Sequence, residues 1–160
     1  LMTDPKEKRE HTMLVDLARH EIYRLAEAST VKVTDLFTVE EYPNLFHLVS
    51  GVRGRLQPDM DALDALLTTI PAGTLSGAPK LEAMRLIEQL ENTRRNFYGG
   101  AIGYLSFNGN ANTGITIRSV FVKDGMSFMR AGAGIVALST PENEAKEIQL
   151  KSENGMKVLQ

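Results

Sequence analysis

The stretch Pro-Ala-Gly-Thr-Leu-Ser-Gly-Ala-Pro-Lys, residues 71–80, is the most informative part of this sequence. It lies between two amphipathic helical patterns and has few bulky side chains. Its two glycines permit positive φ angles and close approach of a ligand, and its two prolines stiffen the ends. Thr74 and Ser76 add hydroxyl groups, and Lys80 opens the next helix. The stretch is either a plain connector or a cradle for an anionic small molecule held by backbone N–H groups.

Helical and strand periodicities alternate around this loop. Helical patterns cover residues 5–26, a segment capped by Asp59 and ended by Pro71, residues 81–90, and a segment that begins at Thr140-Pro141. Strand patterns cover residues 29–41, 46–56, 98–107, 114–122 and 126–136, with turns at 108–110 and 124–125. This order predicts an α+β fold with a largely antiparallel sheet and flanking helices.

Composition restricts the possible functions. The 160 residues are 42% hydrophobic and 24% charged, with a formal net charge of −2, so we expect neither nucleic acid nor membrane as a partner. No cysteine is present, which excludes disulfides, a thiolate nucleophile and cysteine-ligated metals and fits a cytoplasmic protein. The chain begins at Leu1 and enters a helical pattern within a few residues. We therefore expect a fragment of a longer protein.

Two pairs of glutamates could form a metal site. Glu7 and Glu10 lie three residues apart on the first predicted helix, and Glu144 and Glu147 lie three apart on the last. Residues at this spacing share a helix face. If the two helices face each other, their carboxylates form an oxygen-rich site suited to Mg²⁺. The alternative is that all four are ordinary charges on solvated faces.

Histidine could supply acid–base chemistry. His47 lies in a strand pattern, where it is either a structural residue or an acid or base beside a bound ligand. His11 and His20 lie on the first predicted helix, and we expect both to be structural or exposed.

Donors for an anion occur in the second half of the chain. Arg118 ends an apolar strand pattern, and burying its guanidinium there requires a carboxylate partner from the protein or a substrate. Tyr98 begins the preceding strand and offers a hydroxyl group. The bare backbone of residues 131–134, Ala-Gly-Ala-Gly, is either tightly packed strand or a source of N–H donors.

Taken in order, seven blocks of this sequence resemble the chorismate-utilising enzymes, most closely the large subunits of anthranilate synthases. The blocks are Glu7-x-x-Glu10-His11-x-Met13-Leu14-Val15-Asp16-Leu17, Val39-x-x-Tyr42 with His47-Leu48-Val49-Ser50, residues 71–80, Tyr98-Gly99-Gly100-Ala101-x-Gly103-Tyr104, Ile115-x-Ile117-Arg118, residues 131–136, and Pro141-Glu142-x-Glu144-x-x-Glu147-x-x-x-Lys151. The resemblance covers nearly the whole chain. It implies that residues 1–160 form the C-terminal portion of a chorismate-binding catalytic domain, within a larger two-sheet fold.

The resemblance also implies a reaction and a role for individual residues. Chorismate is aminated and loses its hydroxyl group and then pyruvate, giving anthranilate for tryptophan biosynthesis. Ammonia comes from a glutamine amidotransferase subunit or domain. By this resemblance Glu10 and Glu147 hold Mg²⁺ with Glu144 beside them, Glu7 is the general acid, and His47 serves the release of pyruvate. The implied substrate-binding residues are Thr74, Tyr98, Arg118, Gly132, Gly134 and Lys151.

Two other readings remain open at this stage. One is an aminodeoxychorismate synthase of folate biosynthesis, which makes a different product from the same substrate. The other is an inactive fragment that self-associates through unpaired strand edges and a divided core. The resemblance implies that an N-terminal part of the parent protein completes the active site, so we expect the isolated chain to be inactive.

Overall fold

The computed structural model of the chain describes residues 5–42 and 45–157. The helices are α1 (Pro5–Tyr23), the 3₁₀ turn η1 (Ala28–Thr30), α2 (Ala62–Thr69), α3 (Gly73–Ser76), α4 (Lys80–Leu90) and α5 (Pro141–Lys157). The strands are β1 (Lys32–Tyr42), β2 (Leu45–Arg53), β3 (Ala101–Leu105), β4 (Ala111–Ile115), β5 (Val120–Lys123) and β6 (Met126–Met129). The predicted α+β class is confirmed.

Each strand pairs with its neighbour in sequence, so the strands form three separate antiparallel hairpins. The long β1–β2 hairpin pairs Lys32 with Arg53 at one end and Val39 with Leu48 near the other, with an irregularity between Thr34 and Thr38. The β5–β6 hairpin turns at residues 124–125, where both φ angles are positive, as a two-residue turn of the I′ type requires. The antiparallel pairing and both turns agree with the sequence prediction.

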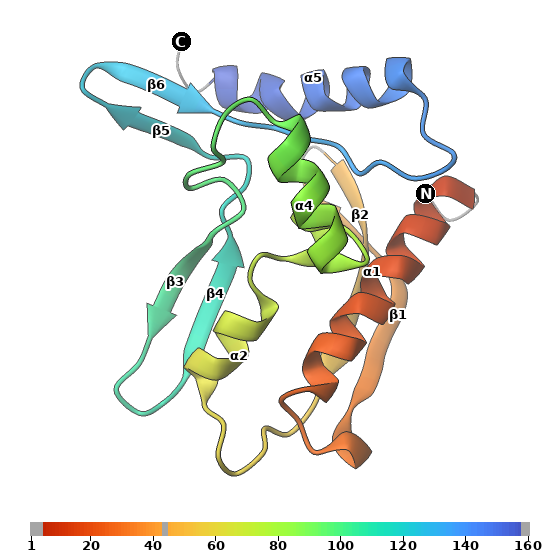
Figure 1. Ribbon diagram of the computed structural model, residues 1–160, viewed down its shortest axis with the longest axis vertical. Helices are drawn as coiled ribbons and strands as arrows, with labels where there is room; N and C mark the ends of the chain where they lie inside the picture. Colours follow the sequence, from red (N-terminus) through yellow and green to blue (C-terminus); the bar gives the residue numbers. More distant parts are fainter. Residues whose placement is uncertain (1–4, 43–44, 158–160) are drawn as a thin grey trace.

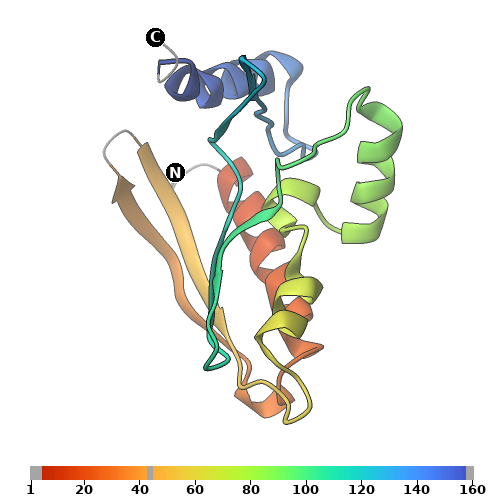
Figure 2. The ribbon, with the colours of Figure 1, turned by 90° about the vertical axis from the view of Figure 1, so that its left-hand side faces the viewer.

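The two longest helices lie beside the hairpins. Helix α1 lies along the β1–β2 hairpin, and α5 crosses the end of the molecule beside β5 and β6 (Figures 1 and 2). The short helix α3 lies within the glycine loop and packs on α1, where a Cβ atom at Gly73 would lie 2.5 Å from Leu17 Cδ2. Lys80 fixes the end of the loop by pairing with Glu21 of α1 and donating to the Thr69 carbonyl. The loop is therefore anchored against the first helix at both ends.

The structure corrects several predicted boundaries. Residues 114–122 are not one strand, because Arg118 has a φ of 52° and the chain turns there between β4 and β5. Strand β6 ends at Met129 rather than at residue 136, since its partner β5 has only four residues. Helix α2 is capped by Asp61 rather than Asp59. The Asp61 side chain accepts from two backbone N–H groups, and Asp64 completes a capping box.

Much apolar surface is uncovered. The accessible surface is 11665 Å², whereas a compact monomer of this mass exposes roughly 8,000 Å². Among the described residues, Leu25 and Ala26 are the buried apolar ones. Large apolar side chains lie exposed on β3, including Ile102 and Leu105. Of the described helices, none is long and apolar enough for a membrane crossing. Exposed patches of this kind are typical of surfaces that contact another chain or segment.

We expect the isolated 160-residue chain to associate, because two-stranded hairpins with apolar faces expose both unpaired edges and hydrophobic area. Analytical ultracentrifugation should give species heavier than the 17.7 kDa monomer, and the chain should bind the dye ANS. Ile102→Lys, which places a charge on exposed β3, should reduce the association. A monodisperse 17.7 kDa monomer that does not bind ANS would contradict the expectation.

Candidate active site

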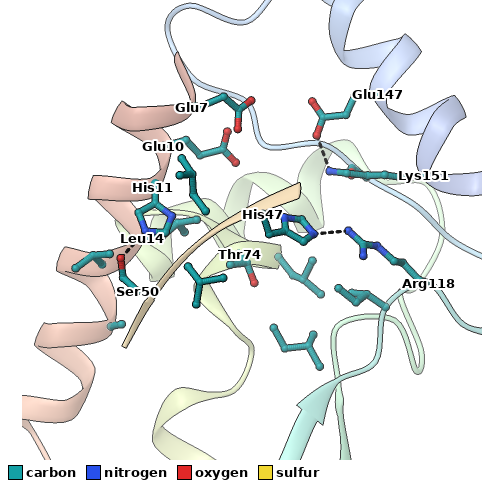
Figure 3. Close-up of a pocket in the computed structure, with 18 of the residues that line it drawn as sticks. Glu7, Glu10, His11, Leu14, His47, Ser50, Thr74, Arg118, Glu147 and Lys151 are labelled. Atoms are coloured by element: carbon teal, nitrogen blue, oxygen red, sulfur yellow. Dashed lines mark hydrogen bonds and ion pairs between the residues drawn. The ribbon is translucent and has the colours of Figure 1, made fainter. Parts of the chain in front are cut away.

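A cleft of about 800 Å³ lies between α1, β2, the glycine loop and α5 (Figure 3). This volume is within the range of small-molecule sites, roughly 300–1,000 Å³. Its polar and charged lining residues are Glu7, Glu10, His11, Tyr42, His47, Ser50, Thr74, Tyr98, Arg118, Arg130, Glu147 and Lys151. The cleft therefore gathers side chains from both halves of the sequence.

Nine of the eleven residues singled out from the sequence line this cleft. They are Glu7, Glu10, His47, Thr74, Tyr98, Arg118, Gly132, Glu147 and Lys151. The other two are adjacent to it through contacts with other residues. Glu144 pairs with Lys6 behind the lining, and Gly134 lies against the Glu10 carboxylate. The structure thus brings the predicted residues together, while their individual roles stay predictions.

One end of the cleft is acidic. Glu7 and Glu10 reach in from α1 and Glu147 from α5 (Figure 3). Burial, with the neighbouring charge of Glu7, raises the pKa of the Glu10 carboxyl. The backbone at Gly134 approaches this carboxyl so closely that a Cβ atom there would lie 2.2 Å from Glu10 Oε1. Glycine at position 134 therefore leaves room for the Glu10 side chain.

Two lysines neutralise this acidic end. Lys6 Nζ donates to Glu144 Oε1 at 2.5 Å and lies 3.8 Å from Glu147 Oε2. Lys151 Nζ donates to Glu147 Oε1 at 2.5 Å and to the Gly132 carbonyl at 3.2 Å. Glu144 is only 4% exposed. Its hydrogen bond from Lys6 holds the pKa of the Glu144 carboxyl below, and that of the Lys6 ammonium above, the ordinary value.

The acidic end has the donor chemistry of a site for a hard divalent cation, because its donors are carboxylate oxygens. Glu144 Oε2 is buried and accepts no hydrogen bond from a described residue, although the Ser139 hydroxyl lies near enough to favour its charged form. As the side chains of the described residues lie, no three acidic or histidine groups converge closely enough to hold a metal ion. The residues fit the ion chemically, and binding one requires the carboxylates to rearrange.

Next to the acidic end, the cleft pairs a histidine with an arginine. Arg118 Nη2 lies 2.8 Å from His47 Nε2 (Figure 3). Because a guanidinium has no acceptor, Arg118 donates and Nε2 accepts, so this contact selects neutral His47 with its proton on Nδ1. Loss of water around the ring, with the charge of Arg118, lowers the pKa of His47. The contact and the lowered pKa therefore both favour the neutral form of His47.

The sequence analysis missed the role of His11 as a link between elements. His11 Nε2 lies 2.7 Å from Ser50 Oγ, and the same hydroxyl accepts from the Phe37 backbone N–H. This chain of contacts joins α1 to both strands of the β1–β2 hairpin. His20 is exposed, and its Nδ1 contacts the Asp16 carbonyl. Both agree with the expected structural or exposed placement, but His11 also lines the cleft.

A network behind the cleft, centred on Arg95, was also missed. Arg95 forms two-pronged hydrogen bonds to the Glu91 carboxylate and donates to the Leu75 carbonyl of the glycine loop. Its guanidinium lies 5.6 Å from the centre of the Tyr98 ring, and Arg130 donates to Glu91 at 2.9 Å. The network ties the loop that carries Thr74 to Tyr98. The only sequence signal was a pair of arginines shortly before Tyr98.

Replacing Arg118 should remove its hydrogen bond to His47 and change the pKa of the imidazole. In the full-length parent protein, Arg118→Gln removes a positive charge and a donor aimed at Nε2, so we expect the pKa of His47 to rise. NMR titration of the imidazole resonances measures the change. Arg94→Gln, at an exposed position with the same change in charge, is the matched control. An unchanged His47 titration in the Arg118 variant would show that the contact does not control the ring.

Comparison with known proteins gives the family of the chain. Residues 1–157 match the model of the family described as chorismate binding enzyme. The chain is 49% identical over 160 residues to anthranilate synthase component 1 of Acetivibrio thermocellus and to that of Aquifex aeolicus. Each alignment covers 100% of this chain and 32% of the relative. It thus spans about a third of the length of these relatives.

Solved structures agree with this relationship. Anthranilate synthase component I from Streptococcus pneumoniae superposes with a TM-score of 0.91 at 47% identity, over 97% of this chain and 36% of that one. A Bacillus anthracis protein assigned as a 2,3-dihydroxybenzoate-specific isochorismate synthase gives a TM-score of 0.89 at 29% identity, over 99% of this chain and 42% of that one. The resemblance seen in the sequence is confirmed: the chain belongs to the chorismate-binding enzyme family.

Proposed function

We propose that this chain is the C-terminal portion of the catalytic domain in the large subunit of an anthranilate synthase. The parent protein would convert chorismate and ammonia to anthranilate, pyruvate and water, and the ammonia would come from a partner glutamine amidotransferase. The observation that carries the proposal is the polarity of the cleft, with carboxylates at one end and Arg118 and Lys151 nearby. The names of the relatives at 49% identity support the same choice of reaction.

The cleft offers complementary groups for a substrate with two carboxylates. Arg118 and Tyr98 would bind the enolpyruvyl carboxylate, since a guanidinium fork and a hydroxyl both donate to such a group. Lys151 would support the ring carboxylate from the acidic end, where Glu147 holds its ammonium. Thr74 is exposed at the cleft and would orient the substrate together with the backbone of Gly132 and Gly134.

The acidic end would supply the cation and the proton. Glu10 and Glu147 would hold Mg²⁺, with Glu144 beside them, in a site made of carboxylates and waters. When bound, such an ion acts as a Lewis acid on the oxygen ligands that it shares with a substrate. Glu7 lies on the same side of the cleft (Figure 3), and it would protonate the hydroxyl group that leaves the ring.

His47 would act in the later step, the release of pyruvate. Its Nε2 lone pair already faces a donor, so the ring is held in the neutral form that can accept a proton. A substrate carboxylate that takes over the Arg118 guanidinium would leave this lone pair open to the substrate. The proposed assignment thus gives Arg118 two successive partners in one cleft.

The surface and composition support the remaining parts of the proposal. The uncovered apolar faces on β3 and the open hairpin edges suit docking of the missing part of the parent chain. A cytoplasmic location is proposed because the chain lacks cysteine and its proposed substrates are small metabolites.

Product analysis of the full-length parent protein tests the proposal. With chorismate, Mg²⁺ and ammonium, we expect anthranilate fluorescence and an equal amount of pyruvate. Glu7→Gln should lower kcat about 10²–10⁴-fold, the usual contribution of a positioned general acid. Glu153→Gln, an exposed substitution on α5, is the control and should retain activity. An aminodeoxychorismate product without pyruvate would favour the folate-pathway alternative, and isochorismate would exclude both.

The close contact of Gly134 with Glu10 gives a second test in the parent protein. Gly134→Ala should displace the Glu10 carboxylate, because the new Cβ atom meets its Oε1 at 2.2 Å. We expect a higher Mg²⁺ concentration for half-maximal activity, with little change in thermal stability since the carboxylate ends a flexible side chain. Gly114→Ala, which meets nothing within 4 Å, is the matched control. An equal Mg²⁺ requirement in both variants would exclude Glu10 as a ligand.

A further inference from the structure

Lys6 lies behind the acidic end of the cleft, in contact with Glu144 and Glu147. It lies in the first turns of α1, one residue from Glu7, and its ammonium reaches across to α5. There it lies 2.5 Å from Glu144 Oε1 and 3.8 Å from Glu147 Oε2. Its side chain is 19% exposed, whereas that of Glu144 is 6% exposed. A single positive charge therefore bridges two of the carboxylates that the proposed metal site uses.

We propose that Lys6 is a built-in counter-ion that takes the place of the divalent cation in the metal-free protein and leaves Glu144 when the cation binds. The proposal rests on the metal site proposed above. It assigns to Lys6 a role that is separate from the reaction itself: it holds the empty site together and competes with the metal.

Charge balance explains why such a residue is needed. Glu144 is nearly buried, and removing the partner of a buried charge is strongly destabilising. Lys6 supplies the missing positive charge, and Lys151 does the same for Glu147. Without these ammonium groups, the carboxylates of Glu10 on α1 and Glu147 on α5 would repel each other with no compensating charge. The pairing therefore stabilises the apposition of the two helices when no metal is bound.

A lysine side chain is well suited to leave its carboxylate partner when a cation binds. Its ammonium is a point charge on a flexible four-carbon stem, in contrast to the rigid fork of arginine. The partial exposure of Lys6 gives it a route to water, while buried Glu144 stays in place. Because no three ligand groups of the described residues converge as the side chains lie, a bound ion would need the carboxylates that Lys6 now contacts. Departure of Lys6 would also free Glu144 Oε1, next to Oε2, which accepts no hydrogen bond from a residue that the structure describes.

A purely structural role makes a different prediction. If Lys6 only joins α1 to α5, it should remain on Glu144 when the metal binds, and its removal should weaken the metal site by loosening the helices. If Lys6 competes with the metal, its removal should tighten metal binding. The sign of the change in affinity therefore separates the two roles.

The test compares Lys6→Met with Lys8→Met in the full-length parent protein. Lys8 is exposed on the same helix, so its variant has the same loss of charge without the contact. Isothermal titration with Mg²⁺, in the absence of substrate, should show about tenfold tighter binding for Lys6→Met, as expected if the lysine-paired state is roughly 90% populated. The metal-free variant should melt at a lower temperature than the wild type, and Mg²⁺ should restore more of its stability. Unchanged or weaker Mg²⁺ binding in Lys6→Met would overturn the proposal.

A second measurement needs no variant. Crystal structures of the wild-type parent protein with and without Mg²⁺ should show Lys6 Nζ on Glu144 only in the metal-free form. Lys6 still hydrogen-bonded to Glu144 beside a bound Mg²⁺ would overturn the proposal, as would absence of Mg²⁺ binding in both wild type and variant. These readouts do not depend on the product formed, so a different reaction product would contradict the proposed function and leave this inference standing.

Discussion

Carboxylates from the two ends of the chain can share a partly buried site only if positive charge comes with them. Glu10 on α1 and Glu147 on α5 both line the cleft, with buried Glu144 just behind. The compensating charges are the ammonium groups of Lys6 and Lys151. Through Lys6 this balance also joins α1 to α5, and both helices contribute residues to the lining of the cleft.

Polar contacts also position the arginine and histidine of the cleft. Arg118 stands in the left-handed region of φ between two short strands, a conformation that costs energy for a residue with a side chain. There it donates to His47 from the other side of the cleft. The Arg95 network fixes the glycine loop and Tyr98 from behind. Polar contacts thus position the side chains of the site in a chain with very few buried apolar residues among those described.

Local patterns in the sequence predicted much of the fold. The helices, the hairpin turns and the antiparallel pairing follow from periodicity and from turn residues such as Asp124-Gly125. The break at Arg118 was missed, although the sequence carries a sign of it: the alternation through Ile115 and Ile117 changes phase before Val120 and Val122. The cap was placed at Asp59 because two aspartates two residues apart are equally good candidates until the backbone N–H groups are located.

The sequence predicted the glutamates of the site but not the long-range contacts around them. The spacing of the glutamates predicted carboxylate pairs on two helices, and the family resemblance indicated that they meet. The long-range contacts of Lys6, His11 and Arg95 were not predicted, because the partners lie between 20 and 138 residues away in the chain, as in the bonds to Leu75 and Glu144. Contacts over such separations depend on tertiary packing, and the periodicity of a single sequence does not reveal them. Arg118 was expected to meet a carboxylate of the protein or of a substrate; its side-chain partner within the protein is His47, and the substrate carboxylate stays a prediction.

The most direct test of this account is a double-mutant cycle on Mg²⁺ affinity in the full-length parent protein, with Glu10→Gln, Glu147→Gln and the double variant. If the two carboxylates hold one ion, each single change should weaken binding strongly, and the double change should add much less than the sum of the two. Strictly additive effects, or Mg²⁺ affinity that neither substitution alters, would show that the opening and closing helices do not share a cation.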